Sequence, residues 1–157
     1  MKNSKKGISL IVLIITIIVI IILAAAVIIT LNNNNPIDEA NNARYASDLD
    51  HLQAVLTNTI AKIMVEKQAV VEIKQVQDIS EDATLDYTVV DAMDGTTGGQ
   101  IIFGRQENSG NTYYTGKELP QYRAGTTTWV VDTDARLYLQ VGSKIYPQGT
   151  ATLPTVP

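Results

Sequence analysis

The chain of 157 residues contains no cysteine and only one histidine, which excludes several kinds of chemistry at once. Without cysteine there is no disulfide framework, no thiolate metal site and no thiol nucleophile. The histidine, His51, stands next to acidic residues, but catalysis or metal binding needs several convergent groups, so we interpret it as a solvated side chain. Packing, hydrogen bonds or assembly with neighbours must therefore stabilise the fold.

Motifs that carry enzymatic chemistry are also missing. The sequence has no glycine-rich phosphate loop, no nucleophile elbow and no metal-ligand pair at a known spacing. Two acidic pairs, Asp91 with Asp94 and Asp132 with Asp134, lack the ligand spacing of a calcium loop, and turn capping explains them more simply. We expect no enzymatic activity, no cofactor and no metal.

Basic residues are few and scattered. The formal net charge is −4, and without the three lysines that precede residue 8 the remaining 9 basic and 16 acidic residues give −7. Nucleic-acid binding needs a clustered basic surface, so nucleic acid is not an expected partner.

What the sequence does contain is one long apolar run. Ile8 to Leu31 covers twenty-four positions without a charge, and fourteen of them are Ile or Val. Such β-branched residues lose side-chain freedom in a helix in water, but in hydrocarbon a single segment can satisfy its own backbone only as a helix. At about 1.5 Å per residue the run spans roughly 36 Å, enough to cross a bilayer core of ~30 Å with some tilt.

The flanks of this run predict its orientation. Lys2, Lys5 and Lys6 precede it, and a short basic segment is held on the cytoplasmic side of the membrane. We therefore expect a single-pass membrane protein with a cytoplasmic N-terminus. The part after Leu31, about 126 residues, is large enough for one extracellular domain.

The start of the run has a recognisable pattern. Lys5-Lys6-Gly7 is followed by Ile8-Ser9-Leu10-Ile11. This resembles the class III signal of type IV pilins and pseudopilins, and the resemblance extends over roughly Lys5 to Val55. It implies cleavage by a prepilin peptidase between Gly7 and Ile8, methylation of the new amine on Ile8, and retention of the apolar helix.

The resemblance also implies a function. The chain would be the structural subunit of a type IV pilus or pseudopilus-like surface filament, in which apolar helices pack laterally into a core. Its partners would be copies of itself or other pilin subunits, the prepilin peptidase, an assembly machinery with a separate motor ATPase, and membrane lipid before assembly. The residues expected in the filament core are Leu10, Ile11, Val12, Leu13, Ala24, Ala25 and Ala26.

Val12 departs from the family pattern. The fifth residue of the mature pilin helix is usually Glu, and the nearest acids here, Asp38 and Glu39, lie beyond the apolar run. Because an amine buried without a counter-charge is costly, this chain needs a neighbour's acid, a lipid phosphate or an amine kept at the interface. This fits a minor pilin or a divergent, Gram-positive-type pilin-like protein better than an abundant major pilin.

Two other interpretations use the same run. Ala24-Ala25-Ala26 looks like a secretory cleavage site, but Ile8 to Leu23 already exceeds the usual core of about 7–15 residues, and the run continues past the alanines. The second alternative is an uncleaved anchor that holds an extracellular binding module. It needs the same residues and no processing.

A second helix is predicted after the polar break at Asn32 to Pro36. Asn35 is suited to the N-cap, Pro36 to the first helical position, and the acids Asp38 and Glu39 to the first turn. Apolar residues then recur at steps of three and four to about Gln68, at Tyr45, Leu49, Leu52, Leu56, Ile60 and Ile63. This apolar face must be buried against another element.

The remainder favours short strands between turn signals. The predicted strands are Val70 to Val76, Leu85 to Val90, Gln100 to Phe103, Thr127 to Asp132, Arg136 to Val141 and Lys144 to Tyr146. The last three predict an antiparallel meander with a turn at Asp132 to Ala135. We therefore predict an α+β fold, in which a long N-terminal helix, half transmembrane and half amphipathic, packs on a small antiparallel β-sheet.

Exposed loops are predicted at Gly95 to Gly99 and Gly104 to Gly125. The second loop contains Tyr113-Tyr114, which either bind a surface or a sugar or, as is more common for tyrosines in a small sheet, pack in it. The predicted divisions are a leader (1–7), a transmembrane or filament-core helix (8–31), the amphipathic helical half (32–69), a β domain (70–148) and a C-terminal tail (149–157).

Overall fold

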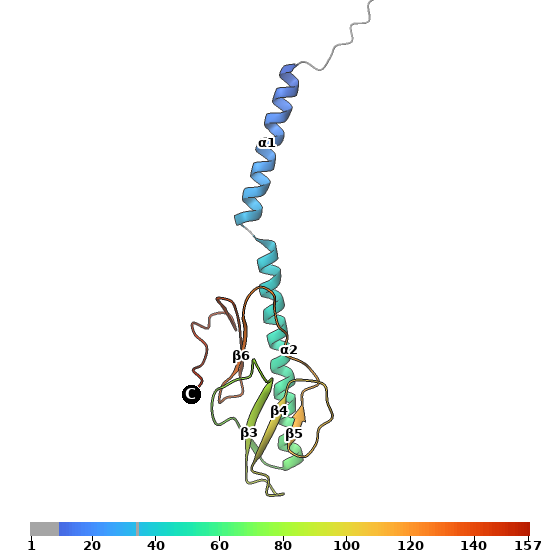
Figure 1. Cartoon of the computed structure of the whole chain (residues 1–157), viewed down its shortest axis with the longest axis vertical. Coiled ribbons are helices and arrows are strands. Elements are labelled where there is room, and N and C mark those ends of the chain that lie inside the picture. The colour runs from blue at the N-terminus through green and yellow to red at the C-terminus, as the bar shows by residue number, and fades with distance from the viewer. Residues whose placement is uncertain (1–9, 34) are drawn as a thin grey trace, which may run out of the picture. The chain divides into compact units, whose positions relative to one another are not determined.

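The computed structural model describes residues 10–33 and 35–157 (Figure 1). The chain falls into two compact units, Met1–Asn42 and Ala43–Pro157, called here the N-terminal and the C-terminal unit. The fold is α+β, as predicted, with a long helical N-terminal part and two small sheets packed against a helix.

Helix α1, Leu10–Asn33, forms most of the N-terminal unit. It has no acidic residue in its first turn and no basic residue in its last turn. Its two hydroxyl side chains are satisfied within the helix, because Thr16 donates to Leu13 C=O and Thr30 to Ala26 C=O, each at 2.8 Å. From Leu10 to Leu31, α1 therefore has no side-chain donor without a partner, as a helix in hydrocarbon requires.

Helix α2, Pro36–Lys67, begins as the sequence predicts. The carbonyl of Asn35 accepts from the backbone N–H of Asp38 at 3.1 Å and of Glu39 at 3.2 Å. The Asn35 amide also donates to the Asp38 carboxylate at 3.0 Å. At the other end Gln68 has a φ of 49°, and Ala69 N–H reaches back to Met64 C=O, which is the hydrogen bond of a Schellman C-cap.

The strands form two sheets, where the sequence predicted one. Sheet A has the order β1 (Val70–Glu72), β3 (Thr84–Val90), β4 (Gly98–Ile102), β5 (Thr112–Tyr114). Sheet B has the order β2 (Gln77–Asp78), β6 (Thr127–Val131), β7 (Leu137–Val141), β8 (Lys144–Tyr146). All pairs are antiparallel except β4 and β5, which are parallel.

Several predicted boundaries need correction. The predicted strand Val70 to Val76 ends at Glu72, because the chain then crosses to sheet B and re-forms as β2. Strand β5 lies inside the segment predicted as a loop, Gly104 to Gly125, and β4 begins inside the other, at Gly98. The meander of β6, β7 and β8 is confirmed, with its first turn closed by Ala135 N–H donating to Asp132 C=O at 3.0 Å.

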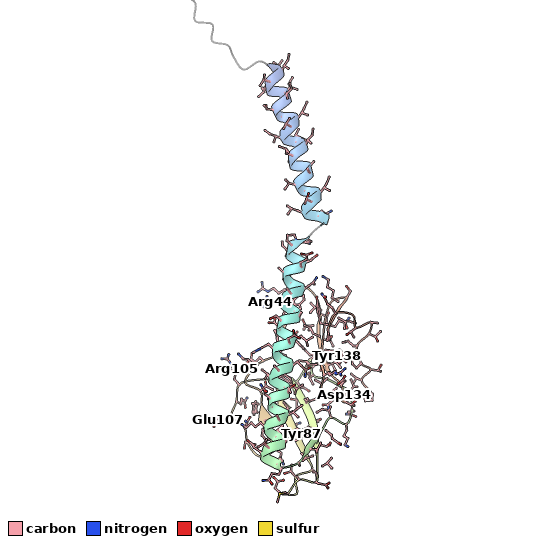
Figure 2. All side chains as sticks on the ribbon, turned by 180° about the vertical axis from the view of Figure 1, so that it is seen from behind. Arg44, Tyr87, Arg105, Glu107, Asp134 and Tyr138 are labelled. Carbon is pink, nitrogen blue, oxygen red and sulfur yellow. The ribbon has the colours of Figure 1, made fainter. Side chains whose placement is uncertain are left out.

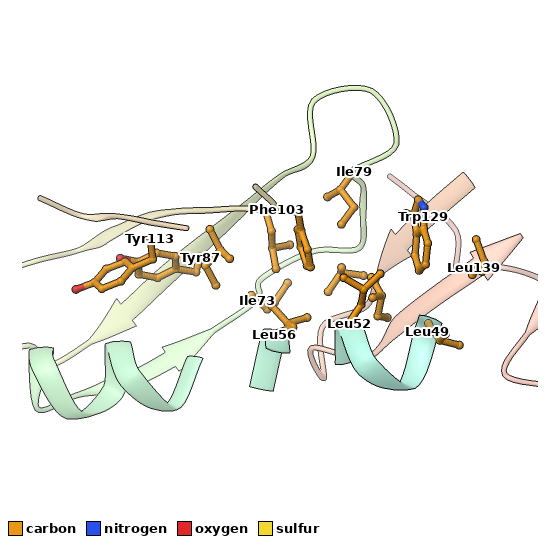
Figure 3. Close-up of a cluster of buried hydrophobic side chains, with 14 of the residues drawn as sticks. Leu49, Leu52, Leu56, Ile73, Ile79, Tyr87, Phe103, Tyr113, Trp129 and Leu139 are labelled. Carbon is orange, nitrogen blue, oxygen red and sulfur yellow. The ribbon is translucent and has the colours of Figure 1, made fainter. Parts of the chain in front are cut away.

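The predicted apolar face of α2 forms one core with both sheets (Figure 3). Its residues are buried, apart from Ile60, which is half-buried. Trp129 of β6 is fully buried, and its indole N–H donates to Pro120 C=O at 3.1 Å. Tyr45 packs edge-on against Tyr122 and Tyr146, so the core extends to the beginning of the C-terminal unit.

Two glutamine side chains act as short pieces of strand. Gln53 of α2 accepts from Leu137 N–H at 2.6 Å and donates to Ala135 C=O at 3.0 Å, which ties the helix to the start of β7. Gln77 accepts from Asp86 N–H at 2.9 Å and donates to Asp86 C=O at 3.0 Å. After Glu72 the main chain no longer pairs with β3, and the Gln77 side-chain amide makes the hydrogen bonds to β3 instead. Because Gln77 belongs to β2, these bonds link sheet B to sheet A.

Candidate assembly surface

The apolar surface of α1 is the largest candidate functional feature. Every large apolar side chain from Leu10 to Leu31 is exposed, from 47% at Val19 to 71% at Leu10. Figure 2 shows these side chains projecting from both sides of the helix. Soluble proteins rarely expose contiguous apolar patches beyond a few hundred Å², so lipid or other protein must cover a surface of this kind.

Among the described residues, one helix is long and apolar enough to cross a membrane, judged by length and composition. It lies near the N-terminus of the chain, and no part of its apolar stretch is buried inside the protein. This is consistent with a single-pass membrane protein.

The residues expected in a filament core occupy two places on α1. Leu10, Ile11, Val12 and Leu13 form its first described turn, and all of them are exposed. Ala24, Ala25 and Ala26 are consecutive, so at about 100° per residue their side chains cover more than half of the helix circumference. The helix is therefore narrow there on several sides.

The predicted processing elements lie outside the described residues. These are the leader lysines Lys2, Lys5 and Lys6, together with Gly7 and Ile8 on the two sides of the predicted cleavage point. Val12 is described, is 50% exposed and has no acidic side chain in its helical turn.

The tyrosine pair of the C-terminal unit separates into a core residue and a surface residue. Tyr113 is buried and packs edge-on against Tyr87, with ring centroids 6.3 Å apart. Burial, followed by the nearby Glu66 carboxylate, raises the pKa of Tyr113 above its usual range. Tyr114 is half-buried beside β4. Packing thus accounts for Tyr113.

One residue of each acidic pair, Asp132 and Asp94, stabilises a turn. Asp132 accepts from the backbone N–H groups of Asp134 and Arg136, both at 2.9 Å, and from the Tyr138 hydroxyl at 3.1 Å. Asp94 accepts from Thr96 N–H at 2.9 Å. No group of three or more metal-ligating side chains occurs in the part of the chain that the structure describes.

Asp94 also forms an ion pair that fixes the loop between β3 and β4 to the end of α2. Its carboxylate lies 2.9 Å from Lys67 Nζ, and the Lys67 side chain is only 13% exposed. Hydrogen bonds from Thr96, and then from Lys67, hold the pKa of Asp94 well below its usual range.

This lowered pKa predicts an acid-sensitive contribution to stability. A carboxyl whose pKa is lower in the folded chain stabilises it above the unfolded pKa of about 3.9, and the effect is lost as pH falls through the folded value. We expect Asp94→Asn to reduce the free energy of unfolding at pH 7, and the difference from the parent chain to shrink below about pH 4. Urea unfolding of both chains at pH 7 and pH 3 measures this. An equal difference at the two pH values would contradict it.

A groove of about 550 Å³ lies beside α2. It is lined by α2, by the segment from β1 toward β2, and by the turn between β6 and β7; the residues are Gln53, Thr57, Ile60, Met64, Val71, Glu72, Ile73, Lys74, Thr133, Asp134 and Ala135. The sequence does not predict this groove. The only trace of it is the alternation of apolar and charged residues at Val71-Glu72-Ile73-Lys74, which by itself predicts a strand.

Comparison of the chain with protein-family models, with curated proteins and with solved structures finds no match.

Proposed function

We propose that the chain is a structural subunit of a type IV pilus or pseudopilus-like surface filament, with the properties of a minor pilin. The observation that carries this proposal is α1, an uncharged helix whose apolar side chains are exposed all around. A membrane anchor needs no more than an apolar span. The Lys5-Lys6-Gly7 sequence before the helix favours processing and assembly in addition.

In this proposal the helix passes from lipid into a protein core. Lipid tails are as apolar as the side chains of α1, so assembly must be driven by close packing. Small residues let helix backbones approach closely, and Ala24, Ala25 and Ala26 supply them. The energy for extraction from the membrane would come from a separate motor ATPase, and the C-terminal unit would form the filament surface.

The amine of Ile8, freed by the proposed cleavage, needs a counter-charge from elsewhere. The described first turn of α1 contains no acid, and Val12 stands where related pilins have one. An acid of a neighbouring subunit, a lipid phosphate or a position at the interface would avoid the cost of a buried charge. This requirement favours a minor position in a filament built with other pilins.

The absence of an acid in the first described turn of α1 also supports a second candidate function. An uncleaved anchor with its N-terminus in the cytoplasm has no buried amine and therefore needs no acid near Val12. In that case α1 would only tether the C-terminal unit, which would act as an extracellular binding module.

The mature N-terminus distinguishes the two proposals. We expect mass spectrometry of the chain purified from its native membrane or filaments to find a first residue Ile8 with a methylated amine. Replacing Gly7 with a bulky residue should leave the leader attached and prevent filament entry. An intact Met1 in the native chain would contradict the filament proposal and support the anchor, whereas a start at Val27 would indicate secretory cleavage.

A further inference from the structure

Sheet A has an open edge at β1, the first strand in its order. Val89 N–H donates to Thr97 C=O at 3.0 Å, so the backbone groups of Val89 point toward β4. Backbone groups alternate in direction along an antiparallel strand, so those of Thr88 and Val90 point toward β1. Val71 lies opposite Val89, whose backbone groups do not face β1. The backbone N–H and C=O of Val71 therefore point away from β3, toward the open side of the sheet.

This edge faces the groove beside α2. The segment Val71–Lys74 lines the groove, while no residue of β3 does, so the groove lies on the unpaired side of β1. Ile60 and Met64 of α2 contribute half-buried apolar side chains to it. Within the described chain no backbone hydrogen bond involves Ile73, and the residue as a whole is only 4% exposed. An extended segment in this groove could therefore hydrogen-bond to the backbone of Val71 and Ile73 and pack on the apolar side chains of Ile60 and Met64.

The charges of Glu72 and Lys74 favour a second copy of the same segment as the partner of this edge. Glu72 and Lys74 stand on either side of Ile73, and their side chains, 41% and 62% exposed, form an ion pair within one copy. If two copies of the segment align antiparallel about Ile73, Glu72 of each copy faces Lys74 of the other. Opposite charges directly across two strands stabilise their pairing, and like charges destabilise it.

We propose that two copies of the chain associate by antiparallel pairing of residues 71–75, which are the end of β1 and the chain that follows it, centred on Ile73. The two Ile73 residues exchange backbone hydrogen bonds, and Val71 of each copy pairs with Gln75 of the other. Val71 and Ile73 keep their buried face, and two Glu72–Lys74 pairs form on the exposed face. The interface is two-fold symmetric and closed. It uses no residue of α1, so it is independent of the proposed filament function.

Cysteine cross-linking tests the register, because the native chain contains no cysteine. Full-length chains carrying Glu72→Cys and Lys74→Cys, with different affinity tags, are prepared in detergent and oxidised separately and as a mixture. We expect a disulfide-linked pair only in the mixture, where it retains one Lys74–Glu72 ion pair. Failure of the mixture to cross-link would overturn the proposal and leave the edge to another occupant. Equal cross-linking of either variant with itself would also overturn it.

Charge reversal tests the pairing without a covalent bond. Glu72→Lys and Lys74→Glu each break the ion pair within a copy and place like charges across the interface. Mixed together, the two variants restore both cross-strand pairs, while neither regains its internal pair. We expect tagged copies to co-purify about tenfold more from the mixture than from either variant alone. Equal recovery in all three samples would contradict the proposal.

Discussion

Ala25→Leu is expected to leave membrane insertion unchanged and to reduce incorporation into the proposed filaments about tenfold or more. Ala25 lies in the middle of the three alanines that narrow α1. Leucine is as compatible with hydrocarbon as alanine, so the membrane-bound state loses nothing. In a packed helical core, extra carbon atoms force neighbours apart at a cost of about 1–3 kcal/mol, and 1.4 kcal/mol corresponds to tenfold.

The measurement compares the amounts of the variant in isolated membranes and in sheared surface filaments. Val19→Leu provides the matched control, since it places the same residue where the native side chain is already bulky and exposed. Equal incorporation of Ala25→Leu and Val19→Leu would contradict close approach at the alanines. Loss of Ala25→Leu from the membrane fraction would show that insertion, and not assembly, had changed.

Gly99→Ala is expected to separate β5 from β4 and to lower the free energy of unfolding by roughly 1–3 kcal/mol. A Cβ atom at Gly99 would overlap the carbonyl oxygen of Asn111 and lie 2.6 Å from the Tyr87 hydroxyl. That hydroxyl donates to the same Asn111 carbonyl at 3.0 Å, and Gln100 N–H donates to it as well. The new methyl group therefore displaces the backbone that starts β5.

Gly104→Ala is the control for this change. Gly104 also lies near the end of β4, but a Cβ there meets nothing within 4 Å. We expect it to alter stability by less than about 0.5 kcal/mol, as is usual for surface substitutions. Chemical unfolding measures both variants, and amide hydrogen exchange at Tyr113 and Tyr114 reports loss of β5. An unchanged exchange rate in Gly99→Ala would contradict the predicted displacement.

The sequence predicted best where a pattern was long. The apolar steps along α2 and the alternation in β6 and β7 extend over enough residues to define a face, and both were confirmed. Strands β2 and β5 have only two and three residues, and no hairpin turn joins either of them to a predicted strand. Strand β5 also pairs in parallel with β4, a neighbour that no hairpin signal indicates.

The same limit applies to single side chains. Gln53 and Gln77 act through one amide each, which leaves no periodic trace in the sequence. Glycine is common in loops, so the sequence predicts a loop at Gly98 and Gly99. In the structure Gly99 lies in β4, where the absence of a side chain allows the close approach of Asn111. The open edge of β1 depends on which strand pairs with which, and one sequence does not specify that order.

The Gln77 amide has a consequence for how the chain can change in length. Four residues separate Glu72, the last residue of β1, from Gln77. This length of chain lets the Gln77 side-chain amide reach the backbone of Asp86 in β3. Connecting segments usually tolerate insertions, but one extra residue here would move the amide out of reach and leave Asp86 unpaired. Divergent relatives of this chain are therefore expected to conserve the number of residues between Glu72 and Gln77.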